Sequence, residues 1–227
     1  MPRARRKAPP APSLTAPAED YLKAIYEIER AGTAAFTNVI ASQLAIAPAS
    51  VSGMIRRLAR QGLLKHEPYH GVCLTSAGRA AALRTLRRHR ILECYLAQVL
   101  GYEWDRLHAE AERLEHAASD ELIDRMARAL GNPTVDPHGA PIPTRDGAVD
   151  ETRHRSLADL TPGDRARVLR MADEDGAFLR YIAEMGITPG TEVEMAARAP
   201  YDGPLTVKVG TAVRSIGVGA ASRVFVE

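Results

Sequence analysis

Apolar residues recur at helical spacing near the start of the chain. Leu22, Ile25 and Ile28 follow one another at intervals of three, and Gly32 comes shortly after them. Such spacing buries one face of a helix, and a glycine favours its end. Acidic residues in the first turn suit the positive end of the helix dipole. These features predict a helix over residues 17–30.

The next pattern predicts a compact helical block with a hairpin. Residues 37–44 and 49–60 have helical periodicity and are separated by a break at 45–48. Two short β-prone runs, 63–65 and 72–75, flank a turn-rich loop. Helix, tight turn, helix and hairpin in this order are typical of a winged helix-turn-helix.

Two long helices are predicted to follow, over residues 76–100 and 105–130, each ending at a glycine. A segment rich in proline and glycine, 132–143, then marks a domain boundary. The remainder, from residue 156, predicts a small β-barrel of about 70 residues. Its predicted elements are a helical stretch at 175–185 and strands at 192–197, 205–210 and 222–226. The predicted fold class is therefore mainly α with small β.

Composition places the chain among ordinary soluble proteins. It has 227 residues, of which 45% are hydrophobic and 26% are charged. No apolar run reaches the roughly 18 residues of a membrane span, so no membrane partner is predicted. Residues 1–16 are basic and proline-rich, which predicts a disordered basic tail rather than a secretory signal. The two cysteines, Cys73 and Cys94, indicate a reducing cytoplasm and are interpreted as small buried hydrophobes.

The net charge of +2 conceals a segregation along the chain. Residues 53–90 contain nine basic residues and one acid, about +8, whereas residues 103–124 contain eight acids and two bases, about −6. The first segment suits a polyanion and the second suits a cation. The alternative is two solvated faces that neutralise each other.

The helix over 49–60 has the composition of a DNA recognition helix. Small and polar residues occupy its N-terminal end, where base edges are read in the major groove, and arginines that reach phosphate follow one to two turns later. The alternative is an amphipathic helix with a solvated arginine face. The predicted DNA-binding residues are Thr37, Ala47, Pro48, Ala49, Ser50, Ser52, Gly53, Arg56, Arg57 and Arg60.

A stretch rich in histidine and glutamate predicts a metal site. At 100° per residue, His108, Glu112, Glu115 and His116 fall on one helical face. On the preceding helix, His89 and Glu93 share a face, and Asp20 is a further candidate. Nitrogen and oxygen ligands without thiolate suit Mn²⁺ or Fe²⁺. The alternative is a solvated face with ordinary pairs, and His66, His70, His138 and His154 are interpreted as surface histidines.

These motifs resemble the diphtheria toxin repressor family of metal-dependent transcriptional regulators over roughly residues 17–145. The part after residue 156 resembles the SH3-like domain of its longer members, by pattern more than by identity. The matching residues are Asp20-Tyr21-Leu22, Ile25-Tyr26-Glu27, Val51-Ser52, Leu74-Thr75-Ser76-Ala77-Gly78, His89-Arg90, the run from His108 through Glu112, Glu115 and His116 to Ser119-Asp120, and the run from His138-Gly139 to Pro141-Ile142-Pro143.

The resemblance implies a cytoplasmic homodimer that binds a palindromic double-stranded operator when loaded with divalent metal, usually at metal-uptake genes. It implies two metal sites per protomer and Mn²⁺, with Fe²⁺ as the second choice. Lys23 stands where short manganese-type members have a carboxylate, which argues against their two-metal cluster. The implied ligands are Asp20, Glu112, Glu115 and His116 in a primary site, and His89, Glu93 and His108 in an ancillary site, with Asp173 and Glu174 as candidates from the third domain.

The predicted domains are a tail (1–16), a winged helix-turn-helix (17–76), a helical metal-binding and dimerisation domain (77–145), a linker (146–155) and an SH3-like domain (156–227). Two other classes of protein stay open as alternatives. One is a metal-independent winged-helix regulator. The other is a metal-dependent hydrolase, but no Gly-x-Ser-x-Gly or His-Glu-x-x-His motif is present, so we expect no enzyme. The third domain has a separate alternative role, docking a partner protein.

Overall fold

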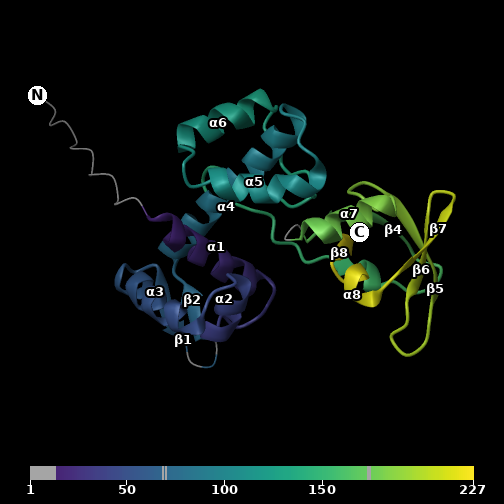
Figure 1. Cartoon of the computed structure of the whole chain (residues 1–227), viewed down its shortest axis with the longest axis horizontal. Helices are drawn as coiled ribbons and strands as arrows, with labels where there is room; N and C mark the ends of the chain where they lie inside the picture. Colours follow the sequence, from purple (N-terminus) through teal and green to yellow (C-terminus); the bar gives the residue numbers. More distant parts are fainter. Residues whose placement is uncertain (1–13, 68, 70, 173–174) are drawn as a thin grey trace, which may run out of the picture. The chain divides into compact units, whose positions relative to one another are not determined.

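The computed structural model describes residues 14–67, 69, 71–172 and 175–227. The chain divides between Leu83 and Arg84 into two compact units, and each is described by itself (Figure 1). The predicted tail lies almost entirely outside the described residues, although Ala16 already belongs to the first helix.

The first unit is the predicted winged helix-turn-helix. Its two strands pair antiparallel, with Leu64 opposite Leu74. The three helices pack on a core that includes Leu22, Ile25 and Ile40, each with no exposed surface. The element bounds are α1 Ala16–Arg30, α2 Thr37–Gln43, α3 Pro48–Arg60, β1 Leu64–Glu67 and β2 Gly71–Leu74.

Two local features fix the wing and the recognition helix. Pro48 is the first residue of α3, where its missing N–H costs no helical hydrogen bond. Gly71 has φ +75°, and a Cβ there would lie 2.5 Å from the carbonyl oxygen of Ala35. Only glycine therefore allows the wing to approach the connection between α1 and α2 this closely.

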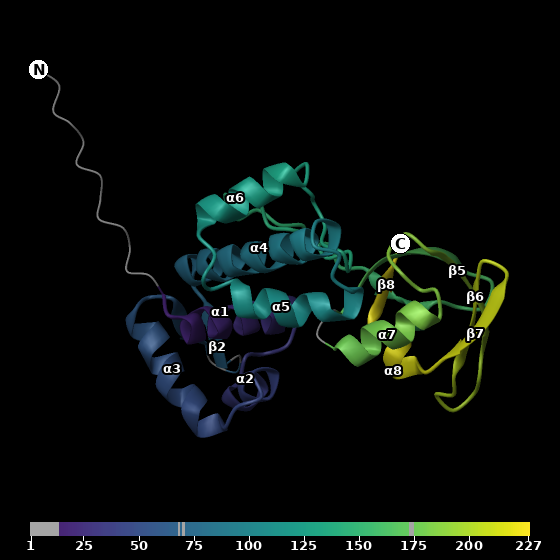
Figure 2. The same cartoon turned by 45° about the horizontal axis from the view of Figure 1, so that its top comes forward.

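The second unit begins within the long helix α4, Ser76–Gln98. Two further helices, α5 (Leu107–Leu114) and α6 (Asp120–Ala129), pack beside α4 and share an apolar core with it (Figure 2). A short 3₁₀ helix, η1 (Trp104–Arg106), precedes α5. The core residues include Ile91, Leu92, Leu107, Ala111, Ile123 and Ala127.

The prediction of one helix over 105–130 is wrong. The helix ends at Leu114, and a turn over residues 115–119 leads into α6. Ser119 begins the second helix because its hydroxyl accepts a hydrogen bond from the backbone N–H of Leu122. Such a cap satisfies a helix N-terminus locally, and an apolar pattern that continues through it conceals the break.

The C-terminal part of the second unit is a six-stranded antiparallel sheet in the order β3-β8-β4-β5-β6-β7, with α7 packed on it. Strands β3, β4 and β7 were not predicted from the sequence. The bounds are β3 Arg155–Ser156, η2 Leu157–Asp159, β4 Arg165–Met171, α7 Gly176–Glu184, β5 Glu192–Arg198, β6 Leu205–Val209, β7 Ala212–Ile216, α8 Val218–Ala221 and β8 Val224–Val226.

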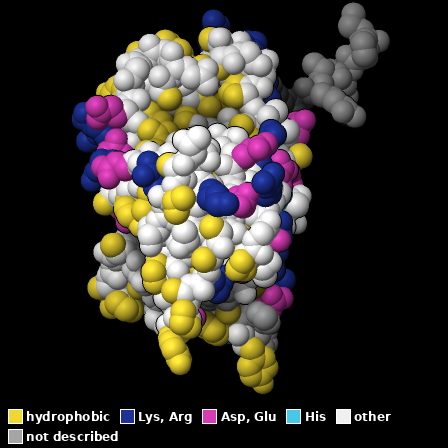
Figure 3. Space-filling view, turned by 90° about the vertical axis from the view of Figure 1, so that its right-hand side faces the viewer, with side chains coloured by type: hydrophobic (Ala, Val, Ile, Leu, Met, Phe, Trp, Pro, Cys, Tyr) yellow, Lys and Arg dark blue, Asp and Glu magenta, His cyan; other side chains and the backbone are white. Residues whose placement is uncertain are grey.

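The charges of this sheet are paired rather than segregated. Glu194 lies between Arg165 and Lys208, 2.9 and 2.6 Å from their nitrogen atoms. Figure 3 shows one face of the surface, on which basic and acidic side chains lie side by side. Among the described residues, no single helix is long and apolar enough to cross a membrane. The pair α2 and α3, bent by 107°, meets the same length and composition test when taken together.

Candidate metal centre and DNA-binding surface

The recognition helix presents the predicted residues to solvent. Only Val51 and Leu58 of α3 are buried, and they face the core of the first unit. Thr37 is half-buried at the start of α2. Nine predicted DNA-binding residues are exposed: Ala47, Pro48, Ala49, Ser50, Ser52, Gly53, Arg56, Arg57 and Arg60. Helix α3 itself contains no acidic residue, so its exposed face suits phosphate.

A hollow of about 330 Å³ lies between α3 and the wing. Ser52 and Arg56 line one side, and His66 and Tyr69 line the other. The Tyr69 side chain is 92% exposed at the tip of the wing. Tyr69 was not predicted to bind DNA, although its place in the loop between the two predicted strands is visible in the sequence.

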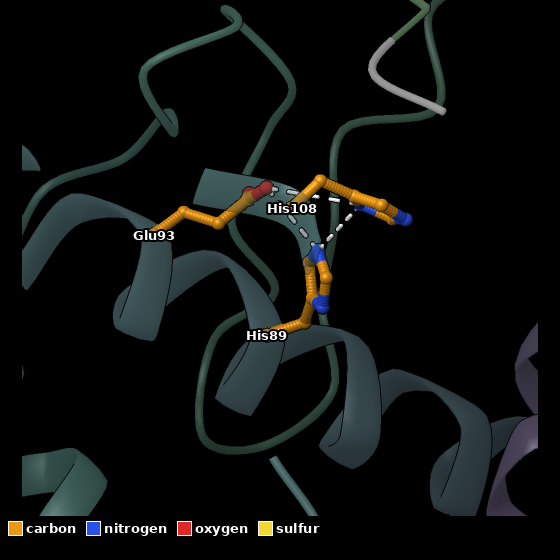
Figure 4. Close-up of side chains that lie close together, drawn as sticks. All are labelled: His89, Glu93 and His108. Carbon is orange, nitrogen blue, oxygen red and sulfur yellow. Dashed lines mark hydrogen bonds and ion pairs between the residues drawn. The ribbon is translucent and has the colours of Figure 1, made fainter. Parts of the chain in front are cut away.

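The predicted metal ligands of the second unit converge on one cluster. His89 and Glu93 are one turn apart on α4, and His108 from α5 meets them (Figure 4). Glu115 and His116 follow α5 in the turn, because the helix ends one residue earlier. We call these residues, together with Glu112, the acid–imidazole cluster: His89, Glu93, His108, Glu112, Glu115 and His116.

His89 is the centre of this cluster. Its Nδ1 atom lies 2.6 Å from the Oε2 atom of Glu115, and its Nε2 atom lies 3.1 Å from Nδ1 of His108. The same Nε2 atom is 3.2 Å from Oε1 of Glu93. A carboxylate that accepts a hydrogen bond from the N–H of one ring nitrogen leaves the lone pair of the other nitrogen available for a cation, which is the usual arrangement around metal-binding histidines. Glu115 therefore directs Nε2 of His89 toward Glu93 and His108.

The two predicted ligand sets are contiguous. Glu112 lies 3.7 Å from Nδ1 of His89 and 3.8 Å from Nε2 of His108, so it contacts residues of the ancillary set. Glu115 lies 3.5 Å from Nε2 of His116 and also bonds to His89. A carboxylate of the primary set thus orients an imidazole of the ancillary set.

The donor set fits a divalent cation. Glu93 and Glu115 have no exposed surface, and a buried carboxylate is costly unless positive charge is near it. Among the described residues, the ion-pair partners of Glu93 are three imidazoles, those of His89, His108 and His138. Imidazole nitrogen and carboxylate oxygen without sulfur are ligands that Mn²⁺, Fe²⁺ and Zn²⁺ accept.

The prediction that His138 is a surface histidine is wrong. Its side chain has no exposed surface, and its ring packs against that of Trp104, with the centroids 5.1 Å apart and the ring planes tilted by 35°. The sequence signal was weak because this burial depends on Trp104 and on strand β4, both distant in sequence. His66 lies in strand β1 rather than in the loop, and it is exposed as expected. His154 is half-buried. His70 lies outside the described residues.

The remaining ligand predictions have different outcomes. Asp20 is half-buried on α1 in the first unit, and its role as a primary ligand stays a prediction. Asp173 and Glu174 lie outside the described residues. Their neighbour Asp175 caps α7 by accepting a hydrogen bond from the backbone N–H of Ala177, and it pairs with Arg223. Asp175 is thereby engaged within its own domain.

The cysteines take no part in the cluster. Cys94 is buried as predicted, and burial raises the pKa of its thiol to about 12. Cys73 is only half-buried, so the prediction of a buried residue is wrong for it. Its pKa is raised to about 11 by partial burial and by the hydrogen bond that its thiol donates to Glu67. Both thiols are therefore neutral near pH 7.

Three family models match the chain. Residues 13–72 match the N-terminal DNA-binding domain of the iron-dependent repressors, and residues 75–144 match their metal-binding and dimerisation domain. Residues 155–227 match the FeoA domain. These three matches cover the winged helix, the acid–imidazole cluster and the six-stranded sheet.

Individual proteins agree with the models. The iron-dependent repressor IdeR of Mycobacterium tuberculosis is 38% identical over 188 residues, which cover 77% of this chain and 81% of that protein. The diphtheria toxin repressor of Corynebacterium diphtheriae is 31% identical over 201 residues, 83% of this chain and 87% of that protein. A manganese-dependent transcriptional repressor solved with manganese superposes with a TM-score of 0.84, at 39% identity, over 92% of this chain and 98% of that one. The chain therefore belongs to the diphtheria toxin repressor family and is a metal-dependent, DNA-binding transcriptional regulator.

Proposed function

We propose that this protein is a repressor of metal-homeostasis genes for which Mn²⁺, with Fe²⁺ as the second choice, is the corepressor. The contiguous acid–imidazole cluster is the observation that supports this proposal most directly. Its mixed carboxylate and imidazole donors favour Mn²⁺, since carboxylates suit this cation better than thiolates do. We assign one primary and one ancillary position to each protomer, with Asp20 as a further primary ligand on the strength of the sequence resemblance.

The chain's own residues supply the coupling. His89 and Glu93 lie on α4, whereas Glu115 and His116 lie in the turn between α5 and α6. When bound, the cation supplies positive charge that relieves the repulsion among the carboxylates. The hydrogen bond that His89 donates to Glu115 ties the turn to α4. Helix α4 begins two residues after the wing strand β2. A cation that fixes the position of α4 therefore also limits the orientations of the chain that connects α4 to the DNA-binding domain.

The proposed DNA target is a palindromic operator. A homodimer presents two copies of α3 related by a two-fold axis, and such dimers bind half-sites about one helical turn, or a multiple of it, apart. The exposed Ser50 and Ser52 are placed to contact bases or phosphates at the helix N-terminus, and Arg56, Arg57 and Arg60 to contact phosphates. This domain assignment, with boundaries near residues 76, 145 and 156, belongs to the proposal. Cytoplasmic location and the absence of catalysis belong to it as well.

The test is metal-dependent retention of DNA. Protein stripped with chelator is mixed with fragmented genomic DNA at one fixed salt concentration, since phosphate contacts make affinity salt-dependent. We expect specific fragments to be retained with Mn²⁺, or with Fe²⁺ under anaerobic conditions, and not without metal. The variant Glu115→Gln should lose at least tenfold in metal-dependent affinity, because a neutral amide replaces the anionic ligand and is a weaker acceptor for the N–H of His89.

Glu110→Gln is the matched control. Glu110 lies on the same helix, α5, and pairs with Arg113 outside the cluster. It should retain DNA like the unaltered protein. Retention of the same fragments without metal would contradict the corepressor proposal and favour a metal-independent regulator.

A further inference from the structure

His138 and Glu93 form a buried pair that the primary and ancillary positions do not explain. The Nδ1 atom of His138 lies 3.7 Å from Oε1 of Glu93, and neither side chain has any exposed surface. Among the described residues, Nδ1 of His138 has no hydrogen-bond partner, and neither does either carboxylate oxygen of Glu93. Buried polar atoms are almost always hydrogen-bonded, so these three atoms require an explanation.

The hydrogen bond of the His138 ring determines which of its two nitrogen atoms has no hydrogen. Its Nε2 atom lies 3.2 Å from the backbone carbonyl oxygen of Trp104. A carbonyl oxygen only accepts, so Nε2 has the hydrogen and donates it. In the neutral ring, Nδ1 then has a lone pair and no hydrogen. That lone pair faces a carboxylate, which has only lone pairs to offer.

The separation of the two atoms fits ligands of one cation. A distance of 3.7 Å is too long for a proton shared in a hydrogen bond. Two donors that each lie about 2.1 Å from a metal ion in tetrahedral geometry are roughly 3.4 Å apart. The observed spacing therefore leaves room for a cation between nitrogen and oxygen.

The surrounding residues hold His138 in this position. Asp136 accepts hydrogen bonds from the backbone N–H groups of His138 and Ala140, and it lies 3.3 Å from Arg90. The backbone carbonyl oxygen of His138 accepts from Met171 in strand β4, 3.2 Å away. The guanidinium of Arg90 and two backbone N–H groups thus engage Asp136, so we assign it the role of positioning His138 rather than that of a ligand.

We propose that a third divalent cation position lies between Glu93 and His138, with the Glu93 carboxylate shared between it and the ancillary position. Mixed imidazole and carboxylate donors indicate a first-row transition cation, with Zn²⁺ as the strongest binder to use as a probe. The candidate donor atoms of His89, Glu93 and His108 lie within 4.8 Å of one another, and so do those of Glu93 and His138 together with the positioning residue Asp136. Glu93 is the residue common to both groups.

The position connects metal binding to the SH3-like domain. The same loop that presents His138 contacts β4, where a Cβ on Gly139 would lie 2.0 Å from the carbonyl oxygen of Leu169. The loop is therefore closely fitted to that strand, and a cation on His138 stabilises the contact between them.

Trp104 provides a local probe of this site, because it is the only tryptophan of the chain and packs against His138. Full-length protein is stripped of metal and titrated with Zn²⁺ while Trp104 fluorescence and the number of bound ions are measured. We expect His138→Phe to bind one ion fewer per protomer and to lose the fluorescence response. His154→Phe, in the loop before β3, should behave like the unaltered protein.

Further variants separate the new position from the ancillary one. His108→Gln removes an ancillary ligand and should retain the response of Trp104 to Zn²⁺, whereas Glu93→Gln should abolish it. His138→Gln, which keeps a donor for the carbonyl oxygen of Trp104, replaces His138→Phe if that variant does not fold. An unchanged ion count and an unchanged fluorescence response in a folded His138 variant would overturn the proposal.

A direct measurement on the unaltered protein is decisive whatever the variants do. Crystals grown with Zn²⁺ should show an anomalous scattering peak within bonding distance of Nδ1 of His138. A map with peaks at the other ligands and none at His138 would show that His138 has a structural role only. Because none of these measurements uses DNA, failure of this proposal is distinguishable from failure of the proposed regulatory function.

Discussion

At the scale of single residues, the histidines differ in how far their surroundings determine their role. His89 has partners on both ring nitrogens, and its proximity to Glu93 was predictable because Glu93 is one turn away on the same helix. His138 is equally buried, but the residues that bury it lie in η1 and β4. Periodicity relates neighbours on one element and contains no information on contacts between distant elements.

Asp159 offers a residue-scale prediction. Its carboxylate accepts hydrogen bonds from the backbone N–H and the hydroxyl of Ser156, and these bonds lower its pKa. A depressed pKa in the folded state means that this stability is present above the ordinary carboxyl pKa, near 4, and is lost as the pH falls through the lower folded value. Asp159→Asn should lower the stability by about 1 kcal/mol at pH 7, because hydrogen bonds to a charged acceptor are stronger than those to a neutral amide oxygen.

Thermal unfolding at pH 7 and at pH 3 tests this prediction. The difference between Asp159→Asn and the unaltered protein should shrink at the lower pH. Asp202→Asn, on an exposed turn, is the control, and it should leave the unfolding temperature unchanged at both pH values. An equal difference at both pH values would show that the charge of Asp159 is not what stabilises the η2 turn.

At the scale of elements, the sequence pattern placed most helices within two residues of their ends. It failed at residues 115–119 because a polar cap, rather than a loss of apolar periodicity, ends α5 and begins α6. The predicted shared face of His108, Glu112, Glu115 and His116 therefore rested on a continuous helix that does not exist. The ligands still converge, because the turn directs Glu115 back toward α4.

The N-cap of α6 gives an element-scale prediction. The Ser119 hydroxyl satisfies the backbone N–H of Leu122, so Ser119→Ala should destabilise the second unit by about 1 kcal/mol. Ser119→Asp preserves an acceptor at the helix N-terminus and should restore the stability. Chemical denaturation of the three proteins without metal measures the difference. Equal stability of the alanine variant and the unaltered protein would show that the break between the helices does not depend on this cap.

The sheet of the C-terminal part was predicted only in outline. The pattern found β5, β6 and β8, and it missed β3, β4 and β7. In β4, arginines alternate with buried residues such as Ala166 and Val168, and in β7 only Ile216 is buried. Short, strongly charged strands resemble loops in sequence, and only pairing with their neighbours identifies them.

At the scale of the whole molecule, metal binding and folding are linked. Buried carboxylates that lack a nearby cation oppose folding, so a cation that binds only the folded chain stabilises it. Mn²⁺ at 100 times its dissociation constant should add about 2.7 kcal/mol for each site. Mg²⁺, which prefers oxygen ligands and retains its water, should add much less.

Thermal unfolding of stripped protein with each ion measures this effect. Glu93→Gln should lose part of the stabilisation by Mn²⁺, whereas Glu110→Gln should keep all of it. Equal stabilisation by Mn²⁺ and Mg²⁺ would indicate a non-selective acidic surface in place of an imidazole-containing site.

The absence of sulfur from the acid–imidazole cluster has a consequence under oxidative stress. Peroxide inactivates a thiolate sensor by converting its ligand sulfur to sulfenic acid, and the cluster has only imidazole and carboxylate ligands. Of the two thiols elsewhere, the half-buried Cys73 has its pKa raised to about 11 by partial burial and by its hydrogen bond to Glu67, so it is a neutral and weakly reactive thiol near pH 7. Because the cluster contains no thiol, we expect brief exposure to peroxide to leave Mn²⁺-dependent DNA binding unchanged, whereas a sensor with thiolate ligands would lose its response.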